Sequence, residues 1–172
     1  MKKVVAKYPR SMMYFHHIVA ILMIASFVVG KVAGENKQIM PLHKSIGLLL
    51  LIFAVIRIVN RLQNRSDIPA TVNQGGKLLA EKVVHSLLII MTVVLPVAGW
   101  LTSNFAGRAV SFFGLFDLPT LVSKNEVMAQ TLGGMHKAGA MIFLALLVIH
   151  VFAVFYHKIK AGESVMSRML PW

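Results

Sequence analysis

Four long apolar stretches, separated by polar connections, constrain the fold of this sequence more than any other feature. They cover about residues 12–32, 42–62, 78–102 and 132–157. A helix that crosses the hydrocarbon core of a bilayer needs roughly 20 predominantly apolar residues, and each stretch is long enough. We therefore expect an all-α membrane protein in which residues 1–172 form one domain, a bundle of four transmembrane helices.

The composition supports a membrane protein and restricts the cofactors that the chain can hold. Hydrophobic residues make up 57% of the sequence and charged residues 14%, a balance that is unusual for a water-soluble domain. The chain has no cysteine, which excludes disulfides, iron–sulfur clusters, thiolate zinc sites and covalently attached c-type haem. The net charge of +12 is carried almost wholly between the apolar stretches, which indicates membrane topology and lipid contact rather than nucleic-acid binding.

The positions of lysine and arginine predict the orientation in the membrane, because such residues are enriched on the cytoplasmic side. Of the 18 Lys and Arg, 12 lie on the side that holds both termini and 6 lie on the other. We therefore expect both termini in the cytoplasm. The connection over about residues 104–130 is then external, and its phenylalanines indicate a segment that lies in the membrane interface, as an anchor or as a lid.

Prolines and glycines mark expected features of the helices. Pro9 and Pro41 are placed to open the first and second helices, and Gly133-Gly134 is placed at the start of the fourth. Pro96 lies inside the third stretch and is expected to kink that helix.

The seven histidines lie within or at the ends of the apolar stretches, where an unpaired polar ring is costly. His136 and His150 are 14 residues apart, so in one helix they lie within about 40° of the same face and about 21 Å apart along the axis. His43 is expected at the depth of His136, and His16 nearer the depth of His150. Since two rings at one depth can be the axial ligands of a haem, we predict two b-type haems, held by His43 with His136 and by His16 with His150.

The same histidines allow two other interpretations. A single histidine in a membrane helix is more often a hydrogen-bonding residue than a metal ligand. A haem-free metal transporter is a further alternative, but metal transport usually needs ligands around one point, with carboxylates among them. Here the histidines form two groups on opposite sides, and no Asp or Glu lies in the middle of an apolar stretch.

Glycines near these histidines are consistent with a flat cofactor between helices, since small residues let a ring system approach the backbone. Gly47 follows one of the proposed ligands by a helical turn, and Gly139 lies close to another. Gly30 and Gly99 are expected to act in the same way.

Seven short motifs follow one another along the chain. They are Tyr8-x-Arg10 with His16 six residues on; Leu42-His43-Lys44-Ser45-Ile46-Gly47; Arg57-x-x-x-Arg61; His85 followed by Leu95-Pro96 and Gly99; the segment over residues 111–119; His136 and His150 followed by His157; and Arg168-Met169-Leu170-Pro171. In this order and spacing the motifs resemble the bacterial cytochrome b561 family over about residues 8–171. That family is related to the membrane cytochrome b subunits of hydrogenases and formate dehydrogenases.

The resemblance implies two haems b in the bacterial inner membrane, and the family's haem ligands fall on His16, His43, His136 and His150. The family usually has tryptophan after the first ligand, where this chain has His17. Either ring of this doublet is then available as the ligand, and the register favours His16. The resemblance also implies ubiquinone as a partner, and the small stand-alone members resemble a superoxide oxidase that passes electrons from external superoxide to quinone.

Basic residues beside the outer pair are candidates for attracting such an anion. Lys44 and Lys137 directly follow the outer ligands, and Arg108 lies in the external connection. Together they would form a basic mouth that steers a small anion such as superoxide. In the alternative, they pair with haem propionates or reach lipid headgroups.

Histidines toward the inner side are candidates for a quinone site. Quinone reduction consumes protons, which an imidazole can supply, so we assign His85, His157 and Arg61 to a pocket near the inner haem. In the alternative, these histidines only hydrogen-bond headgroups or backbone. A rival function is an anchor that relays electrons between a soluble periplasmic redox protein and the quinone pool, although the connections are short for a docking platform.

Overall fold

Four long helices form the fold, and each is long and apolar enough to cross a membrane. The structure is a computed structural model that describes residues 6–70, 74–161 and 165–169. The helices are α1 (Arg10–Glu35), α2 (Met40–Gln63), α3 (Gly75–Phe105) and α4 (Glu126–Ala161). The smaller elements are the 3-10 helices η1 (Lys37–Ile39), η2 (Arg65–Asp67) and η3 (Val165–Arg168) and the strands β1 (Ser111–Phe112) and β2 (Phe116–Asp117). The predicted all-α four-span membrane bundle is confirmed.

The helix boundaries follow the expected signals at two of three positions. Pro9 is the N-cap of α1, and Pro41 lies in the first turn of α2. The fourth helix begins earlier than predicted, so Gly133-Gly134 lies inside α4 and not at its start. The reason is a better cap upstream: Asn125 Oδ1 accepts a hydrogen bond from Met128 N–H at 3.1 Å, as an N-cap residue does.

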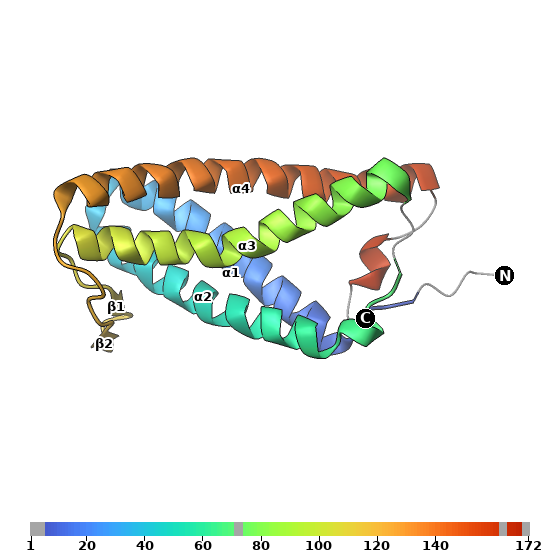
Figure 1. Cartoon of the computed structure of the whole chain (residues 1–172), viewed down its shortest axis with the longest axis horizontal. Coiled ribbons are helices and arrows are strands. Elements are labelled where there is room, and N and C mark those ends of the chain that lie inside the picture. The colour runs from blue at the N-terminus through green and yellow to red at the C-terminus, as the bar shows by residue number, and fades with distance from the viewer. Residues whose placement is uncertain (1–5, 71–73, 162–164, 170–172) are drawn as a thin grey trace.

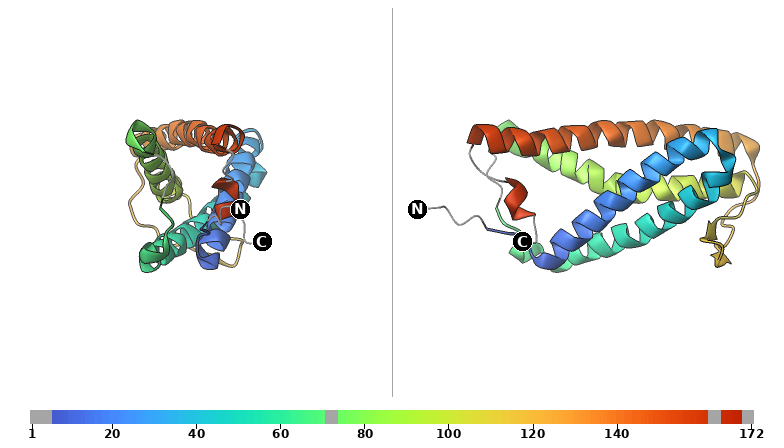
Figure 2. Two further views of the ribbon diagram at one scale, coloured as in Figure 1. Left: turned by 90° about the vertical axis from the view of Figure 1, so that its right-hand side faces the viewer. Right: turned by 180° about the vertical axis from the view of Figure 1, so that it is seen from behind.

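The helices pack in sequence order, α1 on α2, α2 on α3 and α3 on α4. Viewed along the bundle, they form the four sides of a rough square (Figure 2, left). We call the end with η1 and the β1–β2 strands the hairpin end, and the end with η2 and η3 the terminal end. The helices lie close together at the hairpin end and spread apart toward the terminal end (Figure 1).

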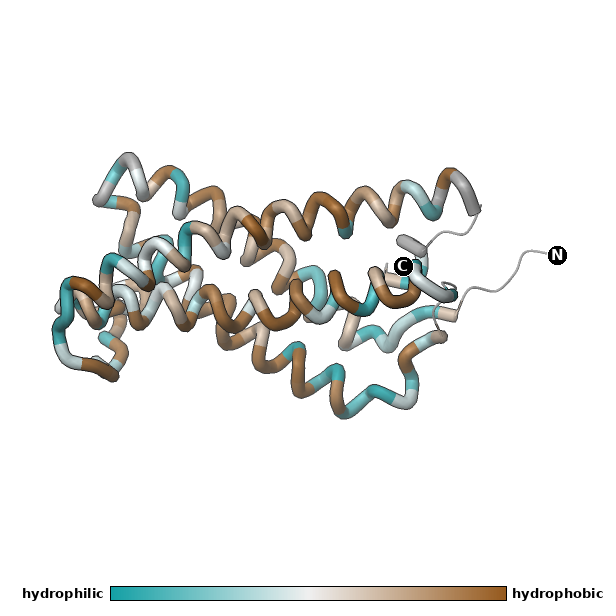
Figure 3. The backbone as a smooth tube through the Cα atoms, turned by 45° about the horizontal axis from the view of Figure 1, so that its top comes forward, coloured by the Kyte–Doolittle hydropathy of each residue, from teal (hydrophilic) through white to brown (hydrophobic). Residues whose placement is uncertain are grey.

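The middle of the bundle is held by a small apolar core, to which every helix contributes. Its buried members are Val19, Met23, Leu50, Leu95 and Phe143. Outside this core, large apolar side chains point away from the bundle, for example Ile21 (66% exposed) and Phe152 (68% exposed). Hydrophobic residues run along the helices while hydrophilic ones gather mainly toward their ends (Figure 3). This exposed apolar surface is what a bilayer covers.

Helix α3 is continuous through Pro96 but not straight. The helix changes direction part way along its length (Figure 1). Proline lacks the N–H that would bond to the carbonyl four residues earlier, here that of Thr92. The Thr92 hydroxyl also donates within the helix, to Ile89 O at 2.6 Å, and such bonds bend helices. The predicted kink therefore has two local causes.

A short β-hairpin interrupts the connection between α3 and α4, which the sequence indicated only as an interfacial segment. Strands β1 and β2 pair antiparallel, with Ser111 opposite Asp117. The buried Ser45 hydroxyl accepts from Phe113 N–H (2.9 Å) and lies within donating distance of Ser111 O (3.0 Å). These bonds fix the hairpin to α2 two residues after His43.

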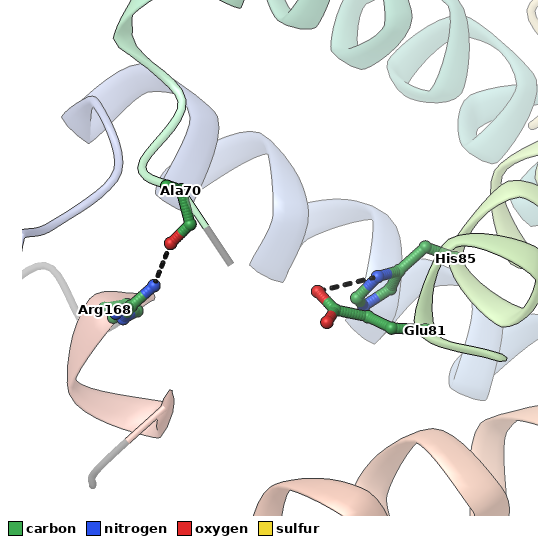
Figure 4. A network of polar contacts seen from close by, with 4 residues as sticks. All are labelled: Ala70, Glu81, His85 and Arg168. Carbon is green, nitrogen blue, oxygen red and sulfur yellow. Dashed lines mark hydrogen bonds and ion pairs between the residues drawn. The ribbon is translucent and has the colours of Figure 1, made fainter. Parts of the chain in front are cut away.

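The terminal end is closed by contacts between segments far apart in sequence. Arg168 Nη1 donates to Ala70 O at 2.8 Å (Figure 4), and Tyr8 N–H donates to Arg168 O at 3.1 Å. The end of the chain is thereby tied to the α2–α3 connection and to the residues that lead into α1. The last two residues of the predicted motif, Leu170 and Pro171, lie outside the described residues.

Candidate functional site

Two imidazole rings face each other at the hairpin end of the bundle. His43, in the first turn of α2, and His136 of α4 have ring centroids 6.1 Å apart and ring planes at 75°. A metal ion bound at about 2 Å by one nitrogen of each ring would place the two centroids about 6 Å apart. The spacing of this hairpin-end pair therefore fits two axial ligands on one iron.

A second pair lies toward the terminal end. The ring centroids of His16 on α1 and His150 on α4 are 6.5 Å apart, with ring planes at 58°. This spacing is close to that of the first pair and fits the same chemistry. The rings that the sequence paired by depth are thus the rings that meet in space, and α4 supplies one ring to each pair. Their role as haem ligands stays a prediction.

Backbone carbonyls hold both rings of the hairpin-end pair. Nδ1 of His43 lies 2.9 Å from Ser26 O of α1, and Nδ1 of His136 lies 3.0 Å from Leu95 O of α3. A carbonyl can only accept, so each Nδ1 carries the proton and donates it. Each Nε2 is then left with a free lone pair in a fixed direction, the arrangement of histidines that bind metals. All four helices contribute to this site.

Side chains, and not carbonyls, surround the terminal-end pair. Nη2 of Arg57 on α2 lies 3.3 Å from Nδ1 of His16. A guanidinium can only donate, so this Nδ1 accepts and the ring proton lies on Nε2. Binding of iron through Nε2 therefore requires the proton to move to Nδ1 and the guanidinium to turn away from it. Within the described residues, the His150 ring contacts two other rings, those of His16 and His85, and has no hydrogen bond. Again every helix supplies a residue.

His85 of α3 stands beside this second pair. Its ring centroid is 5.0 Å from that of His150, which is too short for two ligands on opposite sides of one iron. Its Nδ1 lies 3.9 Å from Glu81 Oε1, one turn earlier on the same helix (Figure 4). With 46% of its side chain exposed, His85 reaches from the surface of the bundle to His150.

The structure distinguishes the two rings of the His16-His17 doublet. Nδ1 of His17 donates to Met13 O of its own helix at 2.7 Å. Its ring meets that of His16 edge-on, with centroids 5.3 Å apart. Of the two, His16 is the one opposite His150, in agreement with the register of the motif.

The three basic candidates at the hairpin end differ in how they are held. Lys44 is half-buried, and its Nζ donates to Ala109 O at 3.2 Å, in the connection after α3. Arg108 is exposed, and its charge acts on that of Lys44. Lys137 is exposed beside His136. Lys44 therefore has a structural partner in addition to any effect on anions.

The three quinone candidates do not form one cluster. His85 joins the terminal-end pair, as described above. Arg61 is exposed in the last turn of α2, and its charge acts on His85. Among the described residues, the His157 ring contacts that of Tyr156, with centroids 5.8 Å apart, and not that of His85.

The glycines divide into two kinds. A Cβ added to Gly47 would meet no atom within 4 Å, and one added to Gly139 would meet a methyl group of Leu95 at 2.8 Å. A Cβ on Gly30 or Gly99 would instead meet an imidazole ring. The last two glycines thus make room for histidines, where the sequence suggested room for a flat cofactor.

Sequence reasoning missed three parts of these sites. The carbonyls of Ser26 and Leu95 carry no signal in the sequence, because any residue has one. Arg57 was noted only within a motif, although a charged residue inside an apolar stretch is itself a signal of function. Glu81, whose Oε1 is 3.9 Å from Nδ1 of His85, lies in the first turns of α3, where a carboxylate is not by itself a signal of a site.

No group of three or more His, Cys, Asp or Glu suited to a single metal ion occurs in the part of the chain that the structure describes.

Comparisons with known proteins identify the same family that the sequence motifs resemble. Residues 7–172 match the family described as prokaryotic cytochrome b561. A protein of Escherichia coli (strain K12), named cytochrome b561 homolog 2, is 28% identical over 163 residues, which cover 91% of this chain and 87% of that protein.

Proposed function

This chain belongs to the prokaryotic cytochrome b561 family, and we propose that it moves electrons across the membrane through two b-type haems. Membership in this family indicates a membrane electron-transfer protein that uses haem b. The observation that carries the finer proposal is the presence of two imidazole pairs, each spaced for one iron, toward opposite ends of the bundle.

We assign His43 and His136 to one haem and His16 and His150 to the other. When bound, each haem supplies an iron that gains or loses one electron. The protein's part is to set the orientation and basicity of each ring. At the hairpin end, the Nδ1–H bonds to carbonyls fix the tautomer that leaves Nε2 free to bind.

The two pairs are joined by a single helix. Since α4 is continuous from Glu126 to Ala161, the 14 positions between its two histidines correspond to about 21 Å along the axis. In our proposal, this separation lets one haem lie toward each face of a bilayer of about 30 Å hydrocarbon thickness. Electrons taken up near one face then leave near the other.

We propose superoxide as the donor and ubiquinone as the acceptor. Two superoxide ions each lose one electron to give two molecules of oxygen, and one quinone takes both electrons and two protons to give the quinol. Lys44, Lys137 and Arg108 gather positive charge at the hairpin end, which favours approach of a small anion. At the terminal end, His85 and Glu81 can carry protons to a quinone beside His150.

The membrane orientation belongs to the same proposal. The excess of Lys and Arg on the terminal side supports an orientation with both termini in the cytoplasm of a bacterial inner membrane. Superoxide then reacts on the periplasmic side and the quinone takes its protons from the cytoplasmic side.

Stopped-flow spectroscopy on the purified haem-loaded protein tests donor and acceptor. We expect superoxide to reduce the haems and a ubiquinone analogue to reoxidise them. In Lys44→Gln and Lys137→Gln, the reduction should slow roughly two- to fivefold and depend less on salt. Because Lys44 also binds Ala109 O, Lys137→Gln is the cleaner variant.

Failure of superoxide to reduce the haems would favour the relay function. If superoxide leaves the haems oxidised while the quinol reduces them, the chain is a relay between the quinone pool and a soluble periplasmic redox protein. Absence of haem from the purified, folded protein would remove both assignments.

A further inference from the structure

The two halves of the bundle contain the same three-part unit at the hairpin end. In the first half, His43 of α2 donates to Ser26 O of α1, and its ring lies against Gly30. In the second half, His136 of α4 donates to Leu95 O of α3, and its ring lies against Gly99. In both halves, the glycine follows the accepting residue by four positions.

The four-residue spacing has a geometric reason. In an α-helix the carbonyl of residue i already accepts the N–H of residue i+4, and the side chain at i+4 points back toward the N-terminus over that carbonyl. A glycine at i+4 removes this cover. The second lone pair of the carbonyl is then accessible to a donor from a neighbouring helix.

The distances are too short for a side chain and the imidazole to share this space. An ideal Cβ at Gly30 would lie 2.7 Å from Cε1 and 2.8 Å from Nδ1 of His43. At Gly99 the nearest approach would be 3.2 Å, to Cε1 of His136. Any residue larger than glycine would therefore push the ring away from the carbonyl, more strongly in the first half than in the second.

The other glycines among the described residues do not share this arrangement. A Cβ at Gly34, one turn after Gly30 on the same helix, would meet nothing within 4 Å. Gly139 faces the end of a flexible leucine side chain, which can move. The close approach is therefore specific to the two glycines opposite the paired rings.

We propose that Gly30 and Gly99 are positioning residues that orient the two ligands of the hairpin-end haem, through one unit used in both helical hairpins. This inference rests on the proposed haem assignment. Each glycine exposes one carbonyl, and the carbonyl fixes both the Nδ1–H tautomer and the plane of its imidazole. The two ring planes are thereby held at 75° to each other, and each ring becomes a more basic ligand.

The orientation of two axial imidazoles has a spectroscopic signature. In a low-spin ferric haem, nearly perpendicular ring planes give a more anisotropic electron paramagnetic resonance signal than parallel planes. A stronger Nδ1–H bond also favours the ferric iron, so its loss raises the midpoint potential. Neither property responds to packing that leaves the rings in place.

The test compares Gly30→Ala, Gly99→Ala and the control Gly34→Ala in the full, haem-loaded protein. His43→Ala, which removes a ligand, identifies the signal of the hairpin-end haem. We expect Gly30→Ala either to change the electron paramagnetic resonance signal of the hairpin-end haem and raise its midpoint potential, or to lose the hairpin-end haem alone. Gly99→Ala should produce the same changes to a smaller extent, and Gly34→Ala none.

Two results would overturn the inference and leave the haem assignment standing. One is an unchanged hairpin-end signal and potential in both Gly30→Ala and Gly99→Ala. The other is a change confined to the terminal-end haem. If wild-type protein has no low-spin haem signal, or His43→Ala keeps both signals, the haem assignment itself fails and this inference fails with it.

Discussion

The hairpin-end pair and the terminal-end pair have nearly the same spacing but are held in different ways. Ring centroids are 6.1 Å apart in the first and 6.5 Å in the second. In the first pair, both rings donate to backbone carbonyls of helices that do not carry them. In the second, one ring accepts from Arg57 and the other packs on His85.

This difference separates a fixed site from an adjustable one. A carbonyl in the middle of a helix has a single position, so it allows one ring orientation. Arg57 and His85, by contrast, are side chains with rotamers of their own. A carbonyl also makes its imidazole more electron-rich, whereas a guanidinium adds positive charge, which favours the ferrous state of a nearby iron. The terminal-end haem should therefore have the higher potential, which directs electrons toward it.

The largest effect is expected from removing one ligand of each pair. His136→Ala should lose the hairpin-end haem and His150→Ala the terminal-end haem, because a bis-imidazole site with one ring no longer holds its iron in the low-spin state. Haem content per chain would fall from two to about one in each variant. Pyridine haemochrome assays with low-temperature spectra give the measurement.

His17→Ala is the matched control for this pair of variants. It removes an imidazole next to His16 that already donates to Met13 O, so two haems should remain. Loss of a haem from His17→Ala with retention in His16→Ala would exchange the roles of the doublet. Loss of both haems from either α4 variant would mean that the sites are not separate.

An intermediate effect is expected at His85, on the terminal-end side of the comparison. His85→Phe should slow reoxidation of the haems by a quinone analogue about tenfold or more, because a positioned proton donor is lost. The haem spectra should stay intact. His157→Phe, which removes a ring that contacts Tyr156 and not His85, should have a smaller effect. Equal rates in wild type and His85→Phe would place the quinone elsewhere.

The smallest effect is expected from Arg57, and it tests the electrostatic half of the comparison. Arg57→Gln removes a positive charge next to His16 and should lower the potential of the terminal-end haem by roughly 50–100 mV, or about 1–2 kcal/mol. Arg57→Lys keeps the charge and should shift it less. Redox titration followed at the two haem bands gives both values. A shift of the hairpin-end haem instead would contradict the assignment of Arg57.

The four helices and the pairing of the histidine rings with each other could be predicted from the sequence because they depend on hydrophobic composition and on helical periodicity. Four apolar stretches of sufficient length can only become membrane helices, and the spacing of His136 and His150 places both on one stripe of α4. The choice of His16 opposite His150 followed from depth alone. These properties need no knowledge of how the helices cross.

What holds the rings could not be read in this way. Whether Ser26 O or Leu95 O meets an imidazole depends on the crossing of two helices, and every residue has a carbonyl. The predicted start of α4 is wrong because two adjacent glycines resemble a helix boundary, whereas Asn125 provides the cap. The β-hairpin depends on a buried hydroxyl of Ser45 from another part of the chain.

Each hairpin-end histidine forms its hydrogen bond within one pair of consecutive helices, α1 with α2 or α3 with α4. This arrangement affects the order of assembly in the membrane. His43 bonds to α1, which precedes it, and His136 bonds to α3, which precedes it. Each half of the chain can thus aim its imidazole as soon as its two helices have been inserted, before the other half is made. The rings of the terminal-end pair come from α1 and α4, the first and last helices to be synthesised. In the proposed two-haem assignment, haem binding at that end therefore waits for the whole chain.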